Sequence, residues 1–201
     1  MEWIGENARP FAWDDAFDEP RDPYRILVAE LMLTRTNAVA AEAIYERFIA
    51  KFPTLASING SDSEVAKLFE GLGLKKRASR MPELFRQLAN EYHGIIPRTY
   101  SKLTSLYGIG PYVANAVLCF AFGRAVVPVD VNVIRVITRL FGVCHDDKKR
   151  FQVFVNGLLD PYVDPGAFAL SLMEMGALVC RVKRPLCEKC PVSDNCAFGS
   201  L

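Results

Sequence analysis

Four cysteines close to the C-terminus constrain this chain more than any other feature. They follow one another at the spacing C-x6-C-x2-C-x5-C and are Cys180, Cys187, Cys190 and Cys196. In a chain without a signal peptide, four clustered thiols favour a metal or iron–sulfur site over two disulfides, because the cytosol keeps thiols reduced. Thiolates bind zinc and iron–sulfur clusters alike, so the ligand type alone leaves both open.

The rest of the chain carries the sequence signals of helices. Asp22-Pro23 is a cap followed by proline at the first helical position, and Tyr24, Leu27 and Leu31 then recur at the spacing of one buried helical stripe. We expect helices near 22–35, 38–51, 62–70, 76–92, 99–106, 111–122, 131–141, 147–157 and 165–178. The one extended piece, residues 125–129, precedes Asp130. The pattern predicts an all-α fold.

The charge distribution permits a nucleic-acid partner without establishing one. The formal net charge is +1, but residues 1–22 are rich in acids, whereas residues 74–102 carry seven bases against Glu83 and Glu91. One surface could therefore meet phosphates while the rest repels them, although such a run is also typical of a solvated helix face.

No segment of the sequence is typical of a membrane protein or of a secreted one. The longest apolar region, residues 113–129, is interrupted by Asn115, Gly123 and Arg124, and the first residues resemble no signal peptide. We expect a cytoplasmic protein with no membrane partner, or a nuclear one in a eukaryote.

A tight turn of two glycines suggests a contact to DNA. Tyr107-Gly108-Ile109-Gly110 separates the helix expected over 99–106 from a second one that begins at Pro111. Glycines let the backbone of Gly108, Ile109 and Gly110 approach a ligand, and free N–H groups at the start of the second helix can hold a phosphate. Alone, such a turn is equally typical of a plain helical corner.

Together with four other segments, this turn resembles the endonuclease III and MutY superfamily of helix-hairpin-helix DNA glycosylases. The similar segments are R-P-F-A-W at 9–13 with D-P-Y at 22–24, A-E-L-M-L-T-R-T at 29–36, G-I-G-P-Y-V-A at 108–114, V-D-V-N-V-I-R-V at 129–136 and the four-cysteine loop. In that family, a loop of the same spacing holds a [4Fe–4S] cluster. The resemblance therefore implies that the four cysteines are the ligands of such a cluster. Tyr107 departs from the pattern, because the family usually has proline there.

The resemblance also implies an architecture and a partner. We expect a six-helix barrel over 22–135, with the helix-hairpin-helix near 99–122, and a cluster domain formed by 1–21 and 136–201. The active site of such a fold lies in the cleft between the two. The expected partner is double-stranded DNA with a mismatched or damaged base, bound by a monomer.

Asp130 is the first candidate for a catalytic residue. It corresponds to the essential aspartate of the family, and a carboxylate facing the sugar can stabilise an oxocarbenium-like transition state and help to place or deprotonate a water molecule. On local sequence alone, Asp130 is a helix N-cap.

Tyr112 stands where bifunctional members have a lysine that attacks the sugar. A phenol cannot form a Schiff base, so the resemblance implies a monofunctional glycosylase that leaves an abasic site. The other interpretation of Tyr112 is a side chain that only packs on the hairpin.

Residues of the segment 29–36 supply the remaining candidates. Glu30 lies off the apolar stripe of its helix, where a carboxyl among apolar groups could donate or share a proton with a flipped base; the alternative is a solvent-facing side chain. Arg35 would fill the space left by that base or bind a phosphate, and Leu33 and Thr36 flank the same contact.

Three differences from the adenine enzymes favour another target base. Thr34-Arg35 replaces two glutamines, Val131 replaces the glycine after the essential aspartate, and no second domain follows the cysteine loop in this sequence. These features are similar to those of thymine–guanine mismatch glycosylases, so we expect removal of thymine or uracil opposite guanine. The alternatives are adenine opposite guanine or 8-oxoguanine and, from another class, an iron–sulfur DNA-binding module without turnover.

Overall fold

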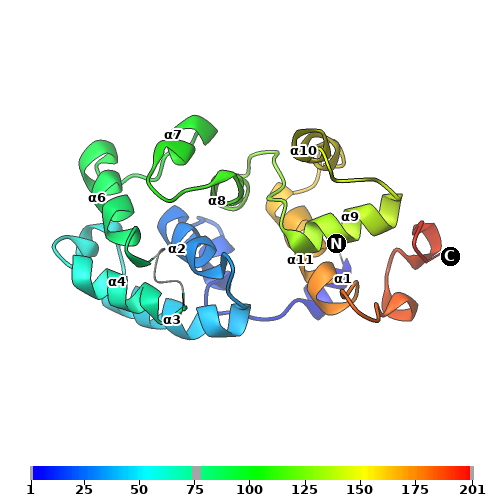
Figure 1. The fold of residues 1–201 in the computed structure, drawn as a ribbon, viewed down its shortest axis with the longest axis horizontal. Coiled ribbons are helices and arrows are strands. Elements are labelled where there is room, and N and C mark those ends of the chain that lie inside the picture. Colours follow the sequence, from blue (N-terminus) through cyan, green and yellow to red (C-terminus); the bar gives the residue numbers. More distant parts are fainter. Residues whose placement is uncertain (1, 74–77, 200–201) are drawn as a thin grey trace. The chain divides into compact units, whose positions relative to one another are not determined.

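The computed structural model describes residues 2–73 and 78–199, and within them it contains helices and no strand (Figure 1). The helices are α1 (Glu2–Asn7), α2 (Pro23–Leu33), α3 (Ala38–Lys51), α4 (Asp62–Glu70), α6 (Met81–Tyr92), α7 (Tyr100–Ser105), α8 (Pro111–Ala116), α9 (Val131–Phe141), α10 (Lys148–Asn156) and α11 (Pro165–Leu178). The predicted all-α fold is confirmed. In the described part of the chain, no helix has the length and apolar character needed to cross a membrane.

Local capping explains why the helices begin where the sequence predicts. The side chain of Asp22 accepts hydrogen bonds from the backbone N–H groups of Tyr24 and Arg25 at the start of α2. The side chains of Asn37, Asp130, Asp147 and Asp164 cap α3, α9, α10 and α11 in the same way. Each cap satisfies N–H groups that have no partner inside the helix.

Three details differ from the expected helices. The sequence analysis did not predict α1. The segment expected as helix over 111–122 is α8 followed by a buried π-helical turn, Val117–Ala121. The helix expected from 76 begins outside the described residues, and after a turn at 79–80 the chain enters α6.

The contacts divide the chain into two compact units. One, here called the hairpin unit, is Pro10–Phe122, and the other, here called the cysteine unit, is Met1–Arg9 with Gly123–Leu201. The domain limits expected from the sequence, near 21 and 135, stay a prediction; residue 135 lies inside α9, which belongs wholly to the cysteine unit.

The hairpin unit is built around α2. Residues 26–32 of this helix are all buried, because α3, α8 and the π-helical turn pack on it. Next to α2, the ring of Phe48 lies 5.2–5.8 Å from the rings of Phe52, Phe69 and Phe85, which joins α3 to α4 and α6. Burial of these side chains is the main stabilising contribution to this unit.

The cysteine unit is held by α9 packed against α11, with α1 also against α11. The guanidinium of Arg9 donates two hydrogen bonds, of 2.9 and 2.6 Å, to the carboxylate of Glu174 on α11, which ties the N-terminal segment to this unit. Where the helices are closest, a methyl group on Gly176 would lie 2.6 Å from Cβ of Asn132. Only glycine allows this approach, and it places α11 directly against the start of α9.

Candidate active site and cysteine pocket

The predicted helix-hairpin-helix is present in the hairpin unit. Between α7 and α8, Gly108 has φ +86°, a left-handed backbone that favours glycine, and Pro111 is the first residue of α8. Ile109 is buried and its N–H donates to the Leu106 carbonyl, which anchors the turn. In the described part of the chain, the N–H groups of Gly108 and Gly110 donate to no acceptor, so both can serve a ligand.

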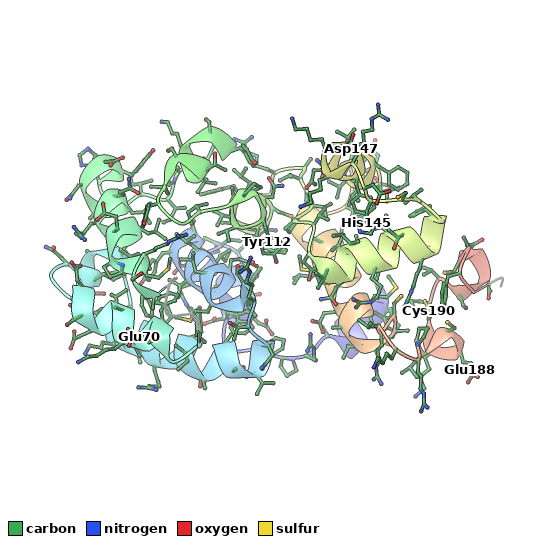
Figure 2. The ribbon with its side chains drawn as sticks, viewed as in Figure 1. Glu70, Tyr112, His145, Asp147, Glu188 and Cys190 are labelled. Carbon is green, nitrogen blue, oxygen red and sulfur yellow. The ribbon has the colours of Figure 1, made fainter. Side chains whose placement is uncertain are left out.

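The structure places Glu30 inside the hairpin unit. This residue of α2 is only 3% exposed, which excludes the solvent-facing interpretation. A carboxyl in such surroundings is stabilised as the neutral acid unless a charge compensates it. Tyr112 lies half-buried on α8 (Figure 2).

The end of α2 presents Arg35 to solvent. Thr34 caps the helix and its hydroxyl donates to the Glu30 carbonyl at 2.9 Å. Arg35 follows with φ +63°, a conformation that is uncommon for a residue with a side chain, and it is exposed. Leu33 and Thr36 on either side are partly buried. The backbone thus bends sharply at Arg35, and the side chain of this residue is exposed to solvent.

Asp130 lies in the cysteine unit and caps α9. Its Oδ1 accepts the N–H groups of Asn132 and Val133 at 2.9 and 2.7 Å, and its Oδ2 accepts Nδ2 of Asn132 at 2.9 Å. Burial raises the pKa of this carboxyl above its ordinary 3.8, and the hydrogen bonds from Val133 and Asn132 oppose that shift. Because one oxygen serves the cap and the other a side chain, the carboxylate is fixed in orientation.

A chain of hydrogen bonds, missed by the sequence analysis, supports Asp130. Oδ1 of Asn132 accepts from Arg135 at 2.7 Å, and the Arg135 guanidinium also donates at 2.6 Å to the carbonyl groups of Gly176 and Cys180. The sequence contained a signal for these contacts, because two arginines, Arg135 and Arg139, lie one helical turn apart on the helix that Asp130 begins. The aspartate is therefore connected to the backbone of the first cysteine of the loop.

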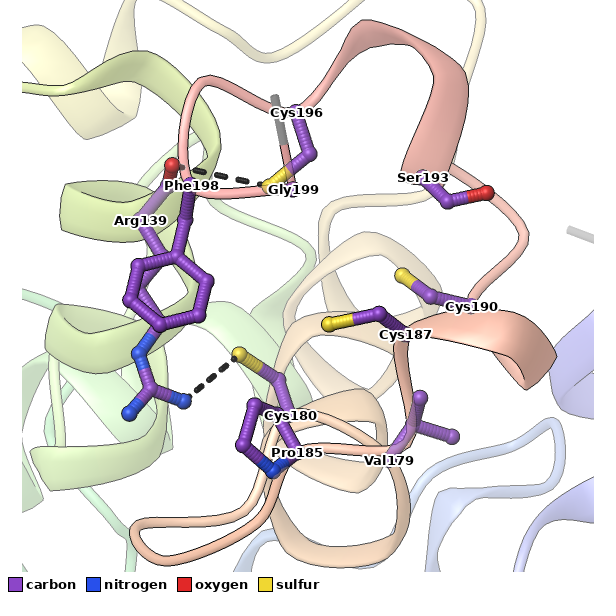
Figure 3. Close-up of a pocket in the computed structure, with 10 residues that line it drawn as sticks. All are labelled: Arg139, Val179, Cys180, Pro185, Cys187, Cys190, Ser193, Cys196, Phe198 and Gly199. Carbon is purple, nitrogen blue, oxygen red and sulfur yellow. Dashed lines mark hydrogen bonds between the residues drawn. The ribbon is translucent and has the colours of Figure 1, made fainter. Parts of the chain in front are cut away.

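The four predicted cysteines line one pocket, and their sulfur atoms point toward it (Figure 3). Arg139 lines one side of this pocket. Its Nη1 donates to Cys180 Sγ at 3.4 Å and to the Arg181 carbonyl at 2.7 Å, and its guanidinium lies 4.7 Å from the Phe198 ring centroid. Burial raises the pKa of the Cys190 thiol, a hydrogen bond with the Val192 backbone opposes this shift, and the other three cysteines add to it. The fold thus gathers four sulfur donors beside a guanidinium.

Residues 28–157 match the family model described as "HhH-GPD superfamily base excision DNA repair protein". The chain is 36% identical to the thymine/uracil-DNA glycosylase of Methanothermobacter thermautotrophicus, over 94% of this chain and 86% of that one. It is 35% identical to human adenine DNA glycosylase over 98% of its own length, but spans only 38% of that relative. The solved structure of a thermostable thymine-DNA glycosylase matches with a TM-score of 0.87 at 34% identity, over 99% of this chain and 92% of that chain. The chain therefore belongs to the HhH-GPD superfamily of base excision DNA repair proteins.

Proposed function

We propose that this protein is a monofunctional DNA glycosylase that removes thymine or uracil mispaired with guanine from double-stranded DNA. The observation that carries the choice of base is the likeness to the archaeal thymine/uracil-DNA glycosylase, which extends over nearly the whole length of both chains. A substrate of this kind would place the enzyme at the chromosome, in the nucleoid of a prokaryote. We expect it to act as a monomer.

In the proposed reaction, Asp130 acts on the sugar. As the bond from C1′ to the base nitrogen breaks, its electron pair leaves with the base and positive charge develops on the sugar. The fixed carboxylate stabilises this charge and accepts a proton from the water whose oxygen bonds to C1′. Its hydrogen bonds to Asn132 and Val133 keep the oxygens in place, so little reorganisation is needed during the reaction.

In this proposal, residues of the hairpin unit contact the flipped base and the DNA backbone. Glu30, buried on α2, donates or shares a proton with the departing base, while Arg35 fills the space that the flipped base leaves, flanked by Leu33 and Thr36. The backbone N–H groups of Gly108 and Gly110 hold a phosphate. Tyr112 provides no amine, so the reaction ends at the abasic site.

We also propose that the cysteine pocket holds a [4Fe–4S] cluster. A zinc ion needs four sulfurs about 2.3 Å from one centre, whereas a cluster spreads four thiolates over its irons and needs them farther apart. Four cysteine sulfur atoms face one pocket, a donor set that suits a cluster as well as a zinc ion. Their spacing along the chain, which resembles that of the cluster loop of the family, favours the cluster. When bound, the cluster would cross-link Cys180, Cys187, Cys190 and Cys196 and so fix the C-terminal loop.

Protein purified without oxygen should be brown and should contain about four irons per chain. Arg139→Ala should lose iron to a chelator roughly 10-fold faster, because Arg139 donates to Cys180 Sγ and to the carbonyl of the next residue. Iron release is followed by colorimetric assay. Arg150→Ala is the control, since Arg150 belongs to the same unit and is exposed on α10. Stoichiometric zinc would contradict the cluster assignment, whereas equal iron release from both variants would contradict the role of Arg139.

Base release from defined duplexes tests the proposed function. We expect release from T·G and U·G pairs under single-turnover conditions, with strand breaks only after alkali. Adenine opposite guanine or 8-oxoguanine is the second candidate, favoured by the match of almost the entire chain to the human adenine enzyme. Faster release of adenine would replace the first candidate by the second. Binding without release from any duplex would instead identify a non-catalytic iron–sulfur module.

A further inference from the structure

Arg80 and Tyr107 form an exposed pair beside the hairpin. The guanidinium of Arg80, just before α6, lies over the ring of Tyr107 at 5.7 Å from its centroid, and Tyr107 is 48% exposed. The backbone N–H of Tyr107 donates to Oε1 of Gln87 at 2.7 Å, which fixes the residue against α6. The pair is therefore attached to a rigid helix and is not a pair of freely moving side chains.

The pair borders the turn in which the N–H groups of Gly108 and Gly110 have no acceptor among the described residues. Cβ of Arg80 would lie 3.9 Å from a methyl group on Gly108, and Tyr107 directly precedes that glycine. The side chain of Arg80 thus begins close to Gly108 of the hairpin turn. In a polyanion, one charged group could bind the hairpin turn while the next group along the same polymer lies within reach of Arg80.

The charge of Arg80 is not neutralised by any residue that the structure describes. Arg80 is exposed and forms no ion pair with a described residue. By contrast, Arg86, six residues further along the chain, pairs with Asp62 at 3.4 Å and with Glu83 at 3.0 Å. In a chain whose net charge is only +1, an unpaired arginine held next to a phosphate-binding turn is suited to a polyanion.

We propose that Arg80, held in position by the ring of Tyr107, binds a second DNA backbone phosphate next to the one held by the hairpin. This inference rests on the proposed action on DNA and adds a contact that is independent of the target base. Arg80 is a binding residue and Tyr107 a positioning residue, because the ring acts on the phosphate only through the guanidinium.

The experiment measures affinity for a fully paired duplex at several salt concentrations. Arg80→Ala should make the slope of log K against log salt less steep by about 0.9, which is the loss of one phosphate contact. It should weaken binding several-fold, with the defect shrinking by about threefold from 50 to 200 mM salt. Arg86→Ala removes the same charge from a paired position and should leave the slope unchanged. An Arg80→Ala slope equal to that of wild type or of Arg86→Ala would overturn the proposal.

Substitutions of Tyr107 test the positioning role. Tyr107→Phe keeps the ring and should bind as wild type does, whereas Tyr107→Leu should lower the slope toward that of Arg80→Ala. In the double variant, Arg80→Ala with Tyr107→Leu, no further loss is expected. If the losses of affinity of the two single variants instead added up in the double variant, the two residues would act separately. Because the duplex has no target base, failure of wild type to release thymine would refute the proposed function without affecting this result.

Discussion

Asp130→Asn should reduce base release by roughly 10²–10⁴-fold while leaving the affinity for mismatched duplex nearly unchanged. The substitution removes the negative charge that stabilises the sugar cation and the group that can accept a proton from water. It removes little binding surface. Single-turnover release of thymine and equilibrium binding to the same duplex measure the two effects separately.

The structure makes this substitution unusually informative, because Asp130 is also the N-cap of α9. Asparagine caps a helix about as well as aspartate, so the melting temperature should change little. A rate within a few-fold of wild type would show that Asp130 is only a cap.

The pH profile is a second control. Because burial raises the pKa of Asp130, the wild-type rate should fall on acidification at a higher pH than for an ordinary aspartate, and the residual rate of the Asn variant should lack this fall.

Tyr112→Lys should convert the enzyme into one that forms a Schiff base with the sugar. Wild type has no amine at this position of α8, so borohydride should trap no covalent adduct and strands should break only after alkali. In the variant, a lysine would stand where bifunctional relatives of this family place theirs. Trapped adduct and alkali-independent nicks should both rise from background, as seen on denaturing gels.

Two controls separate the new amine from other effects. Tyr112→Phe keeps the half-buried ring but lacks an amine, so it should trap no adduct. Lys102 on neighbouring α7 is exposed and could act as an alternative nucleophile. Efficient trapping of the unmodified protein would contradict the monofunctional assignment, and loss of that trapping in Lys102→Ala would identify the amine.

Local features of the sequence determined the helices and the cysteine loop. Aspartate and asparagine caps act on N–H groups two or three residues away, so Asp22, Asp147 and Asp164 mark helix starts without knowledge of the rest of the chain. The glycines of the hairpin and the spacing of the cysteines are equally local. For this reason the all-α fold, the helix-hairpin-helix and the grouping of four thiols could be predicted from the sequence.

Only the tertiary structure decided what surrounds the candidate residues. Helical periodicity placed Glu30 off the apolar stripe, but its burial results from α3, α8 and the π-helical turn packing around α2. The bond from Arg135 to the Cys180 carbonyl joins residues 45 positions apart, and that from Arg9 to Glu174 joins residues 165 apart. Such contacts depend on how whole helices pack, and the close approach of α11 to Asn132 at Gly176 is an example. Helical periodicity describes only one or two turns of a single helix, so it contains no information about these contacts.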